Sequence, residues 1–220
     1  YSIAFLHRQL KEYDKALAAL EPTFEMAPNF SGSSVLKANI LYDQGKLEEA
    51  IDLAADAFDT FPDDHNLGRL YASMLVENKQ LDKAEDIFQS LINHYPQAPS
   101  LKLSLGLVKL ENQKVEEAKL LFEELLANNS HPNEARYYLA RIAEQQKDID
   151  SAISYFQAIE ESPNYEASIE RASFLLAQQN KIDEMLSYLG ELRTSDKSRA
   201  KMLWLLEVKL LSLTQNKDQM

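Results

Sequence analysis

Carboxylates are the side chains of this sequence that come closest to a catalytic arrangement. In the stretch QGKLEEAIDL, residues 44–53, Glu48 and Glu49 follow a glycine and open an apolar segment. A pair of acids facing a substrate could act as general acid and base, but adjacent residues of a helix point about 100° apart. We therefore interpret these two acids as part of a helix start, where negative charge is favoured.

Four acids of the same segment fall on one helical stripe: Glu48, Asp52, Asp56 and Asp59. A stripe of this kind is either a solvated face, which long helices usually have, or a docking strip for a basic partner. We favour the solvated face and keep the docking strip as the alternative.

Histidines and cysteines give no metal site. His7, His65, His94 and His131 are far apart, none with a second nitrogen ligand on its helix face, and the chain has no cysteine. The segments DDHN and HPNE, residues 63–66 and 131–134, instead predict helix starts capped by Asp or Asn side chains. The sequence also lacks GxSxG, phosphate-loop and HExxH motifs. It predicts a non-catalytic protein with no metal and no cofactor.

Charge and hydropathy exclude two classes of partner. Lys and Arg number 23 against 35 Asp and Glu, a net charge of -12, which repels nucleic acid and anionic lipid. The most apolar stretch, MLWLLEVKLLSL, contains Glu207 and Lys209, so no segment is apolar enough to span a membrane. The 45% hydrophobic content is ordinary for a folded protein.

The elements that carry these residues repeat every 34 positions. The repeat is marked by Ala16, Ala50, Ala84, Ala118 and Ala152, with Pro28, Pro62 and Pro96 twelve residues after the first three. Apolar residues at steps of three and four around each alanine predict a helix, and a second segment of helix length precedes it. Each unit is therefore predicted to be a helical hairpin whose alanine marks the closest approach of two helices.

This pattern resembles the tetratricopeptide repeat over residues 1–193. The resemblance rests on the repeated alanines and prolines and on two further sets of residues. The first helices carry small residues, namely Ala38, Ala72, Gly106 and Ala140. Bulky residues follow four positions after the repeat alanine, namely Phe88, Phe122 and Phe156. It implies an all-α solenoid of stacked antiparallel helical hairpins. We expect six hairpins over residues 1–195, the first truncated and the sixth degenerate, and a helix of a further truncated repeat over 196–220, from Ser198 to about Thr214.

Three residues depart from the repeat. Met185 stands where the sixth unit should have its alanine, and Gly190 lies inside the predicted second helix of that unit. Both residues put the regular packing of this unit in question, and because the unit would have relaxed around a large side chain, we expect a mild or even stabilising effect of Met185→Ala. Pro22 falls inside the second helix of the first unit, where it predicts a kink and not a break.

A finer resemblance concerns function. LYDQGKLEEA and NEARYYLARIAEQQKDIDSA are similar to stretches of proteobacterial tetratricopeptide lipoproteins that act as adaptors for periplasmic proteases. This implies a periplasmic adaptor, anchored as an outer-membrane lipoprotein, that presents substrate to a protease. The alternatives are a cytoplasmic assembly scaffold and a substrate-positioning region of an enzyme whose catalytic domain lies outside this chain. The sequence itself does not identify the localisation or the partner.

The family resemblance also implies a site. In tetratricopeptide proteins the first helices line a concave groove that binds a protein or peptide. Transferred to this sequence, the groove residues are Asn39, Tyr42, Arg69, Ser73, Leu103, Leu107, Tyr137, Arg141, Glu144 and Phe174. The carboxylate clamp of the chaperone-binding members is not expected, because Val35 stands where its lysine belongs.

Within this set, Tyr137 and Arg141 are one helical turn apart, so they could form a cation–π pair that offers a guanidinium to a peptide. The alternative is that Tyr137 and Tyr138 pack between helices.

The ends of the sequence suggest a segment of a longer solenoid. Tyr1 would lie inside a first helix, and LTQNKDQM resembles an inter-helix turn. We expect exposed apolar faces around Ile3 and Leu6 at one end and around Met202, Leu203 and Leu206 at the other. Such faces predict weak self-association.

Overall fold

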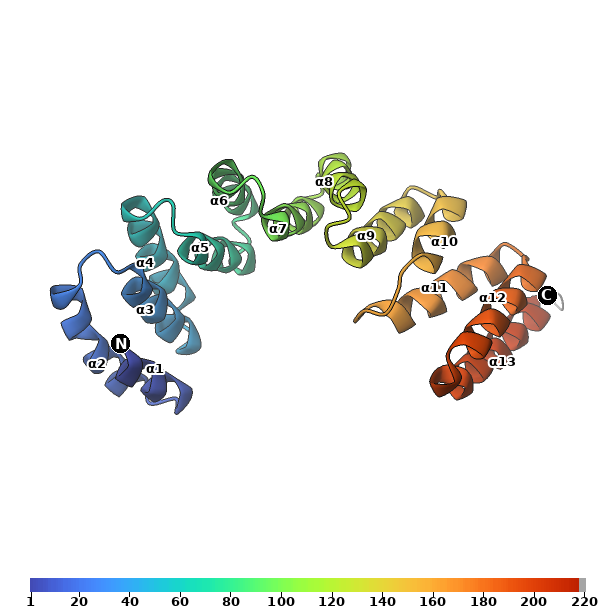
Figure 1. The fold of residues 1–220 in the computed structure, drawn as a ribbon, viewed down its shortest axis with the longest axis horizontal. Coiled ribbons are helices and arrows are strands. Elements are labelled where there is room, and N and C mark those ends of the chain that lie inside the picture. The colour runs from blue at the N-terminus through green and yellow to red at the C-terminus, as the bar shows by residue number, and fades with distance from the viewer. Residues whose placement is uncertain (218–220) are drawn as a thin grey trace. The chain divides into compact units, whose positions relative to one another are not determined.

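The computed structural model describes residues 1–217, with side chains up to residue 213. Its regular structure is entirely helical in this range and consists of sequential hairpins, which confirms the predicted fold class (Figure 1). The helices are α1 (Ser2–Gln9), α2 (Tyr13–Met26), α3 (Ser31–Asp43), α4 (Leu47–Thr60), α5 (His65–Glu77), α6 (Leu81–His94), α7 (Pro99–Glu111), α8 (Val115–Ala127), α9 (Pro132–Gln145), α10 (Ile149–Gln157), α11 (Tyr165–Gln178), α12 (Ile182–Ser195) and α13 (Ala200–Lys217), with a 3₁₀ turn at Lys197–Arg199. None of these helices is long and apolar enough to cross a membrane.

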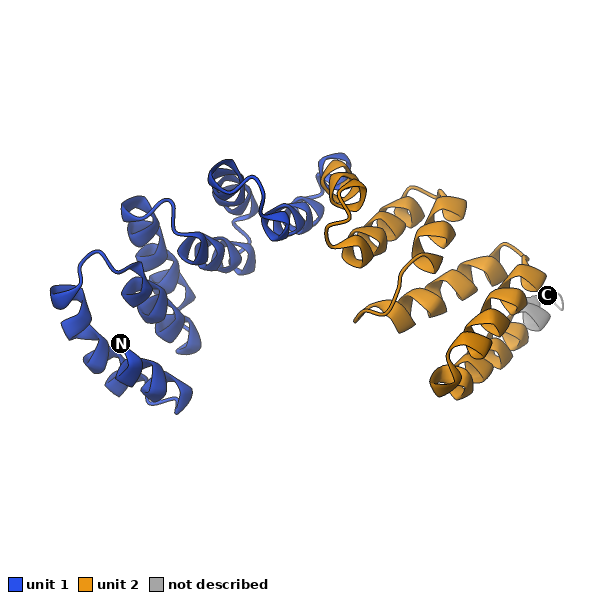
Figure 2. Ribbon diagram, viewed as in Figure 1, with its two compact units in different colours: residues 1–118 blue, residues 119–220 orange. Residues whose placement is uncertain are grey.

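The chain forms two compact units, Tyr1–Ala118 and the part from Lys119 onward (Figure 2). In unit 1 the first helices of the hairpins, α1, α3, α5 and α7, lie along one side, and α2, α4 and α6 lie along the other (Figure 1). In unit 2, α9 packs on α10 and α11 on α12, and α13 contacts both α11 and α12. The side chains predicted to form the site are therefore placed by alternate helices of each unit.

The repeat alanines lie in the buried contacts between helices. Ala16, Ala50, Ala84, Ala118 and Ala152 are all completely buried. The bulky residues four positions later, Phe88, Phe122 and Phe156, are buried as well. Because a larger side chain would overpack these contacts, the alanines fix the spacing of the helices.

The turns inside the hairpins share a left-handed residue that also recurs every 34 positions. Lys11, Gly45, Lys79, Gln113 and Lys147 all have positive φ, and Asn180 occupies the equivalent place one residue early. In the second turn the amide of Gly45 donates to the carbonyl of Tyr42 (2.8 Å) and the amide of Lys46 to that of Leu41 (3.0 Å). These are the two bonds of a Schellman helix end. The turn conformation is thus conserved between repeats although only one repeat uses glycine.

The methionine of the sixth hairpin is part of the core. Met185 is completely buried and belongs to the core cluster of unit 2, together with Leu189 and Leu203. Since the core closes around this side chain, Met185→Ala would leave a cavity, which argues against a mild effect of that substitution. Gly190 lies inside α12 without interrupting it, and α2 continues through Pro22 without a break, as expected.

One of the two predicted helix caps is present. Asp64 accepts hydrogen bonds from the amides of Asn66 and Leu67, both at 2.9 Å. Burial alone would raise the pKa of Asp64, but these bonds and one from the Ser31 hydroxyl lower it. The segment HPNE does open α9, as predicted, but its predicted cap is wrong: the Asn133 side chain does not cap α9 and instead accepts a hydrogen bond from the amide of Glu160, which follows α10 (3.0 Å).

The prediction of exposed apolar residues is correct at one end of the chain and wrong in part at the other. On α1, Ile3 and Leu6 are 64% and 60% exposed, as predicted. On α13, however, Leu203 and Leu206 are buried against the unit 2 core and Met202 packs against it. The helix is rotated relative to the expectation, and it exposes the apolar side chains of Trp204, Leu205 and Val208 instead.

Candidate functional site

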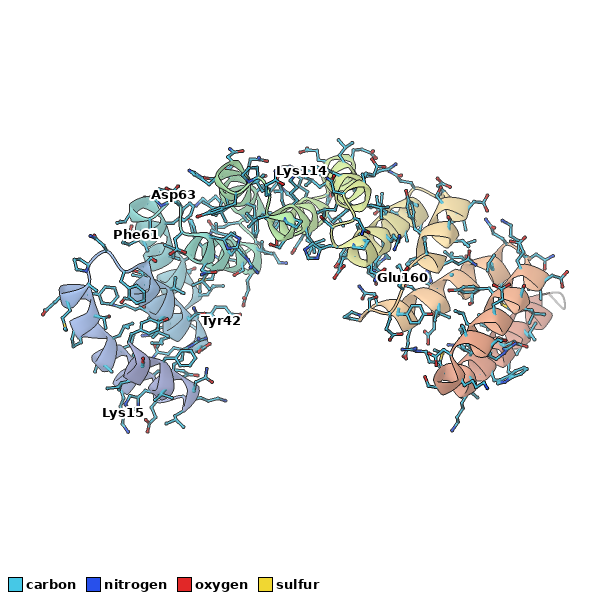
Figure 3. The ribbon with its side chains drawn as sticks, in the orientation of Figure 1. Lys15, Tyr42, Phe61, Asp63, Lys114 and Glu160 are labelled. Carbon is cyan, nitrogen blue, oxygen red and sulfur yellow. The ribbon has the colours of Figure 1, made fainter. Side chains whose placement is uncertain are left out.

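In unit 1 the two predicted site residues of α3 already have intramolecular partners. The Asn39 amide donates to the carbonyl of Val35 at 2.8 Å, within its own helix. The Tyr42 hydroxyl donates to Glu77 of α5 at 2.6 Å, and this bond raises the pKa of Tyr42. Figure 3 shows Tyr42 on the side of unit 1 where the first helices lie. Tyr42 thus helps join α3 to α5, and both side chains already use part of their hydrogen-bonding capacity.

The other unit 1 residues are more available. Arg69 of α5 is exposed, and it forms no hydrogen bond or ion pair with the side chains that the structure describes. Ser73, one turn later, donates to the carbonyl of Leu70 and is also exposed. Leu103 and Leu107, one turn apart on α7, are half-buried. Unit 1 thus offers one uncompensated guanidinium and a small apolar surface on first helices.

In unit 2 the predicted pair on α9 is formed. The guanidinium carbon of Arg141 lies 6.0 Å from the centre of the Tyr137 ring, and its Nη1 donates to the Tyr137 hydroxyl at 3.4 Å. Arg141 is exposed. The Tyr137 ring also contacts Phe156 edge-on, with centroids 6.1 Å apart. Tyr137 therefore both packs against the core and carries an arginine on its outer side.

Tyr138, the neighbour considered as a packing residue, has a structural role. Its ring stacks on Phe122 of α8 with centroids 5.2 Å apart. Burial raises the pKa of Tyr138. The packing interpretation therefore holds for Tyr138, whereas Tyr137 combines packing with a contact to an exposed arginine.

A second arginine, which the sequence analysis missed, continues the site onto α11. Arg171 forms an ion pair with Glu144 of α9, and its Nε donates to Glu144 at 3.0 Å. Its guanidinium carbon also lies 5.1 Å from the centre of the Phe174 ring. Glu144 and Phe174, both predicted, are thus connected through Arg171. The spacing of three residues between Arg171 and Phe174 on one helix could have identified it.

We define the unit 2 site as Tyr137, Arg141, Glu144, Arg171 and Phe174. It combines two arginines, each over an aromatic ring, with one carboxylate that is paired with Arg171. Such a surface can donate hydrogen bonds to carbonyl or carboxylate oxygens and can contact apolar side chains. It contains no nucleophile activated by a base and thus has the chemistry of binding.

A buried charged cluster elsewhere is structural. In unit 1, Lys109 contacts both Glu85 and Glu117, and Glu85 also accepts from Lys114 and Asn112. Burial alone would raise the pKa of Glu85, but the hydrogen bonds from Asn112, Lys109 and Lys114 lower it. Because each of these charges has a partner, the cluster joins α6 to α7 and the start of α8.

Neither the acidic stripe nor a metal centre adds to this site in the part of the chain that the structure describes. The acidic stripe of α4 is fully exposed, which agrees with a solvated face. No group of three or more potential metal ligands occurs among residues 1–217.

Models of known protein families match most of the chain. Two models described as tetratricopeptide repeat match the chain, one over residues 7–74 and 41–106 and the other over residues 103–168. The matched ranges together run from residue 7 to residue 168. A search of curated proteins finds no match.

Solved structures with a similar fold come from several kinds of protein. The Naa15/Naa10 complex bound to HypK-THB is 19% identical with a TM-score of 0.55, over 98% of this chain and 34% of that chain. This chain thus spans about a third of that relative. Pseudomonas aeruginosa PilF is 18% identical with a TM-score of 0.64, over 96% of this chain and 94% of that chain.

YrrB, described as a protein of this repeat type with an unusual peptide-binding site, is 19% identical with a TM-score of 0.59. The match covers 87% of this chain and 98% of that chain. At such identities the likeness to these structures establishes the fold alone.

Proposed function

We propose that this chain, which belongs to the tetratricopeptide repeat family, binds an extended segment of a partner protein on the first helices of unit 2. Repeats of this family are typically non-catalytic scaffolds for protein–protein interaction, and no enzyme family matches the chain. The observation that carries the proposal is the unit 2 site, in which exposed Arg141 lies over Tyr137 and Arg171 lies over Phe174. Arginines and aromatic residues are where binding energy concentrates at protein interfaces.

The free hydrogen-bond donors and the fixed ring of this site support binding of a main chain or a carboxylate. Arg141 forms one long hydrogen bond, to a tyrosine hydroxyl, so most of its five N–H donors remain available. The Tyr137 ring is held by Phe156 from behind, which reduces the entropy lost when a ligand binds. In unit 1, Arg69 is also exposed and is a separate candidate contact.

At a finer level, we favour an adaptor that delivers substrate to a protease in the periplasm, the role implied by the resemblance of NEARYYLARIAEQQKDIDSA to lipoprotein adaptors. That stretch contains both Tyr137 and Arg141. The rival roles are a cytoplasmic assembly scaffold and a substrate-positioning region of a larger enzyme. YrrB shows that this fold can hold a peptide-binding site, which is compatible with all three roles.

Site-specific photo-crosslinking tests the proposal. A photoreactive phenylalanine analogue replaces Gln145, which is exposed on α9 one turn after Arg141, in one variant and Asp52, on the acidic stripe of α4, in the control. In cells that produce the protein naturally, irradiation should give a defined covalent product at position 145 and none at position 52, to be identified by mass spectrometry. Crosslinking at position 52 alone would place the partner on the acidic stripe and refute the proposed site.

A further inference from the structure

A groove between α11 and α13 in unit 2 is lined by apolar side chains and by lysines. Its volume is about 430 Å³, within the range of roughly 300 to 1,000 Å³ typical of ligand sites. Met202, Leu205 and Leu206 form its apolar lining. Leu206 is buried and Leu205 is 63% exposed, so the apolar surface continues from the floor of the groove to its outer edge.

Two uncompensated cations flank this apolar surface. Lys201 and Lys209 line the groove and are exposed, and neither ammonium group has an ion pair with the side chains that the structure describes. One carboxylate, Glu170 of α11, also lines the groove. Two lysines against one glutamate leave the rim with a net charge of +1, in a chain whose net charge is -12.

Two arginines near the groove, in contrast to these lysines, form ion pairs with carboxylates. Arg199 is surrounded by Asp196, Glu161 and Glu166, and Arg193 is paired with Glu207. These arginines are therefore compensated by carboxylates, unlike the two lysines of the groove.

The spacing of the three α13 residues specifies the ligand further. Leu205 lies four residues from Lys201 and four from Lys209, so the ammonium groups start from positions about 12 Å apart along the helix axis. In an extended peptide, residues i, i+2 and i+4 point to one side, and i and i+4 are about 13 Å apart. A peptide with acids at i and i+4 and a large apolar residue at i+2 would match the lysines and Leu205.

We infer that the α11–α13 groove binds an extended acidic segment of the form acid-x-apolar-x-acid, with its carboxylates at Lys201 and Lys209 and its apolar side chain against Leu205. The groove is lined by different residues from the unit 2 site, so variants at Lys201 and Lys209 test it separately from that site. An anionic membrane surface has related chemistry, but a flat surface does not fill a groove and would also meet Glu170.

The test uses the full chain and a fluorescein-labelled peptide, Gly-Ser-Glu-Ala-Leu-Ala-Glu-Ser-Gly, in fluorescence anisotropy titrations at low salt. We expect saturable binding that weakens about tenfold in the double variant Lys201→Ala with Lys209→Ala. The matched control is Lys83→Ala with Lys119→Ala, which removes the same charge from α6 and α8 and should leave binding unchanged. Both pairs of variants are also made in an Arg141→Ala background, so that carboxylates bound at the unit 2 site do not enter the comparison.

Two control peptides test the motif. Replacing both glutamates by glutamine should weaken binding about tenfold, and moving the leucine next to the first glutamate should weaken it as well, because the leucine then points away from the groove. The proposal is overturned if the acidic peptide fails to bind, if the glutamine peptide binds equally well, or if the control lysines matter as much as Lys201 and Lys209. Binding to phosphatidylserine vesicles but not to the peptide would assign the surface to membranes and also overturn it.

Discussion

Replacing Met185 by alanine tests the packing of the sixth hairpin. The Met185 side chain is completely buried in the core cluster of unit 2. The substitution removes Cγ, Sδ and Cε, and at about 0.8 kcal/mol for each group the lost transfer free energy is roughly 2 to 2.5 kcal/mol. A residual cavity adds to this, so Met185→Ala should lower the free energy of unfolding by about 3 kcal/mol, within the range of about 2 to 5 kcal/mol found for such changes.

The reciprocal change provides the control. Ala152, at the equivalent place in the fifth hairpin, is also completely buried, so Ala152→Met should destabilise by about 1 to 3 kcal/mol through overpacking. Urea unfolding followed by far-UV circular dichroism and by the fluorescence of Trp204, the only tryptophan, measures both. Unfolding of repeat arrays can depart from two-state behaviour, so the two signals should be compared. A neutral or stabilising Met185→Ala would refute the packing described for unit 2.

Four further variants probe the turns, a helix cap and an exposed apolar face. Gln113→Gly should raise the free energy of unfolding by about 1 kcal/mol, because Gln113 has a φ of +61°, which glycine adopts without strain. Gly45→Ala should lower the free energy of unfolding for the same reason, since Gly45 also has a positive φ. Urea unfolding measures both effects. Asp64→Ala should cost about 1 kcal/mol at pH 7. Since the folded pKa of Asp64 is lowered, this contribution is complete above about pH 4 and is lost as the pH falls through the folded pKa, so the variant and wild type should converge in acid unfolding experiments. Sedimentation velocity should show concentration-dependent association that Ile3→Ser with Leu6→Ser reduces, and a monomer at every concentration would contradict this.

The hairpins were predictable because their signal is periodic. A buried alanine every 34 residues, as at Ala50 and Ala84, restricts residue size at each helix crossing and so leaves a trace in the sequence. The left-handed turns leave a weaker trace, because Lys79 and Gln113 adopt positive φ where glycine would signal it. Their conformation is imposed by the Schellman bonds and by the packing on either side.

The candidate site and the last helix were predictable in part. The Tyr137–Arg141 pair follows from one-turn spacing, whereas the contact of Arg171 with Glu144 joins two helices and cannot be derived from either one alone. The rotation of α13 was missed for a similar reason. Most of its positions from 202 to 211 are apolar, so only the packing against α11 and α12 determines that Leu203 is buried and Leu205 exposed.

The central claim is that partners bind on the first helices, with exposed arginines as anchors. The most direct test is the affinity of purified variants for the partner identified by crosslinking, measured by isothermal titration calorimetry. Arg69→Ala with Arg141→Ala should weaken binding tenfold or more, and by at least about 2 kcal/mol if either is a hot spot, with helical content and melting unchanged. Asp52→Ala with Asp56→Ala, on the exposed acidic stripe, should have little effect. If the stripe variant loses the partner while the arginine variant keeps it, binding occurs on the second helices and the account is wrong.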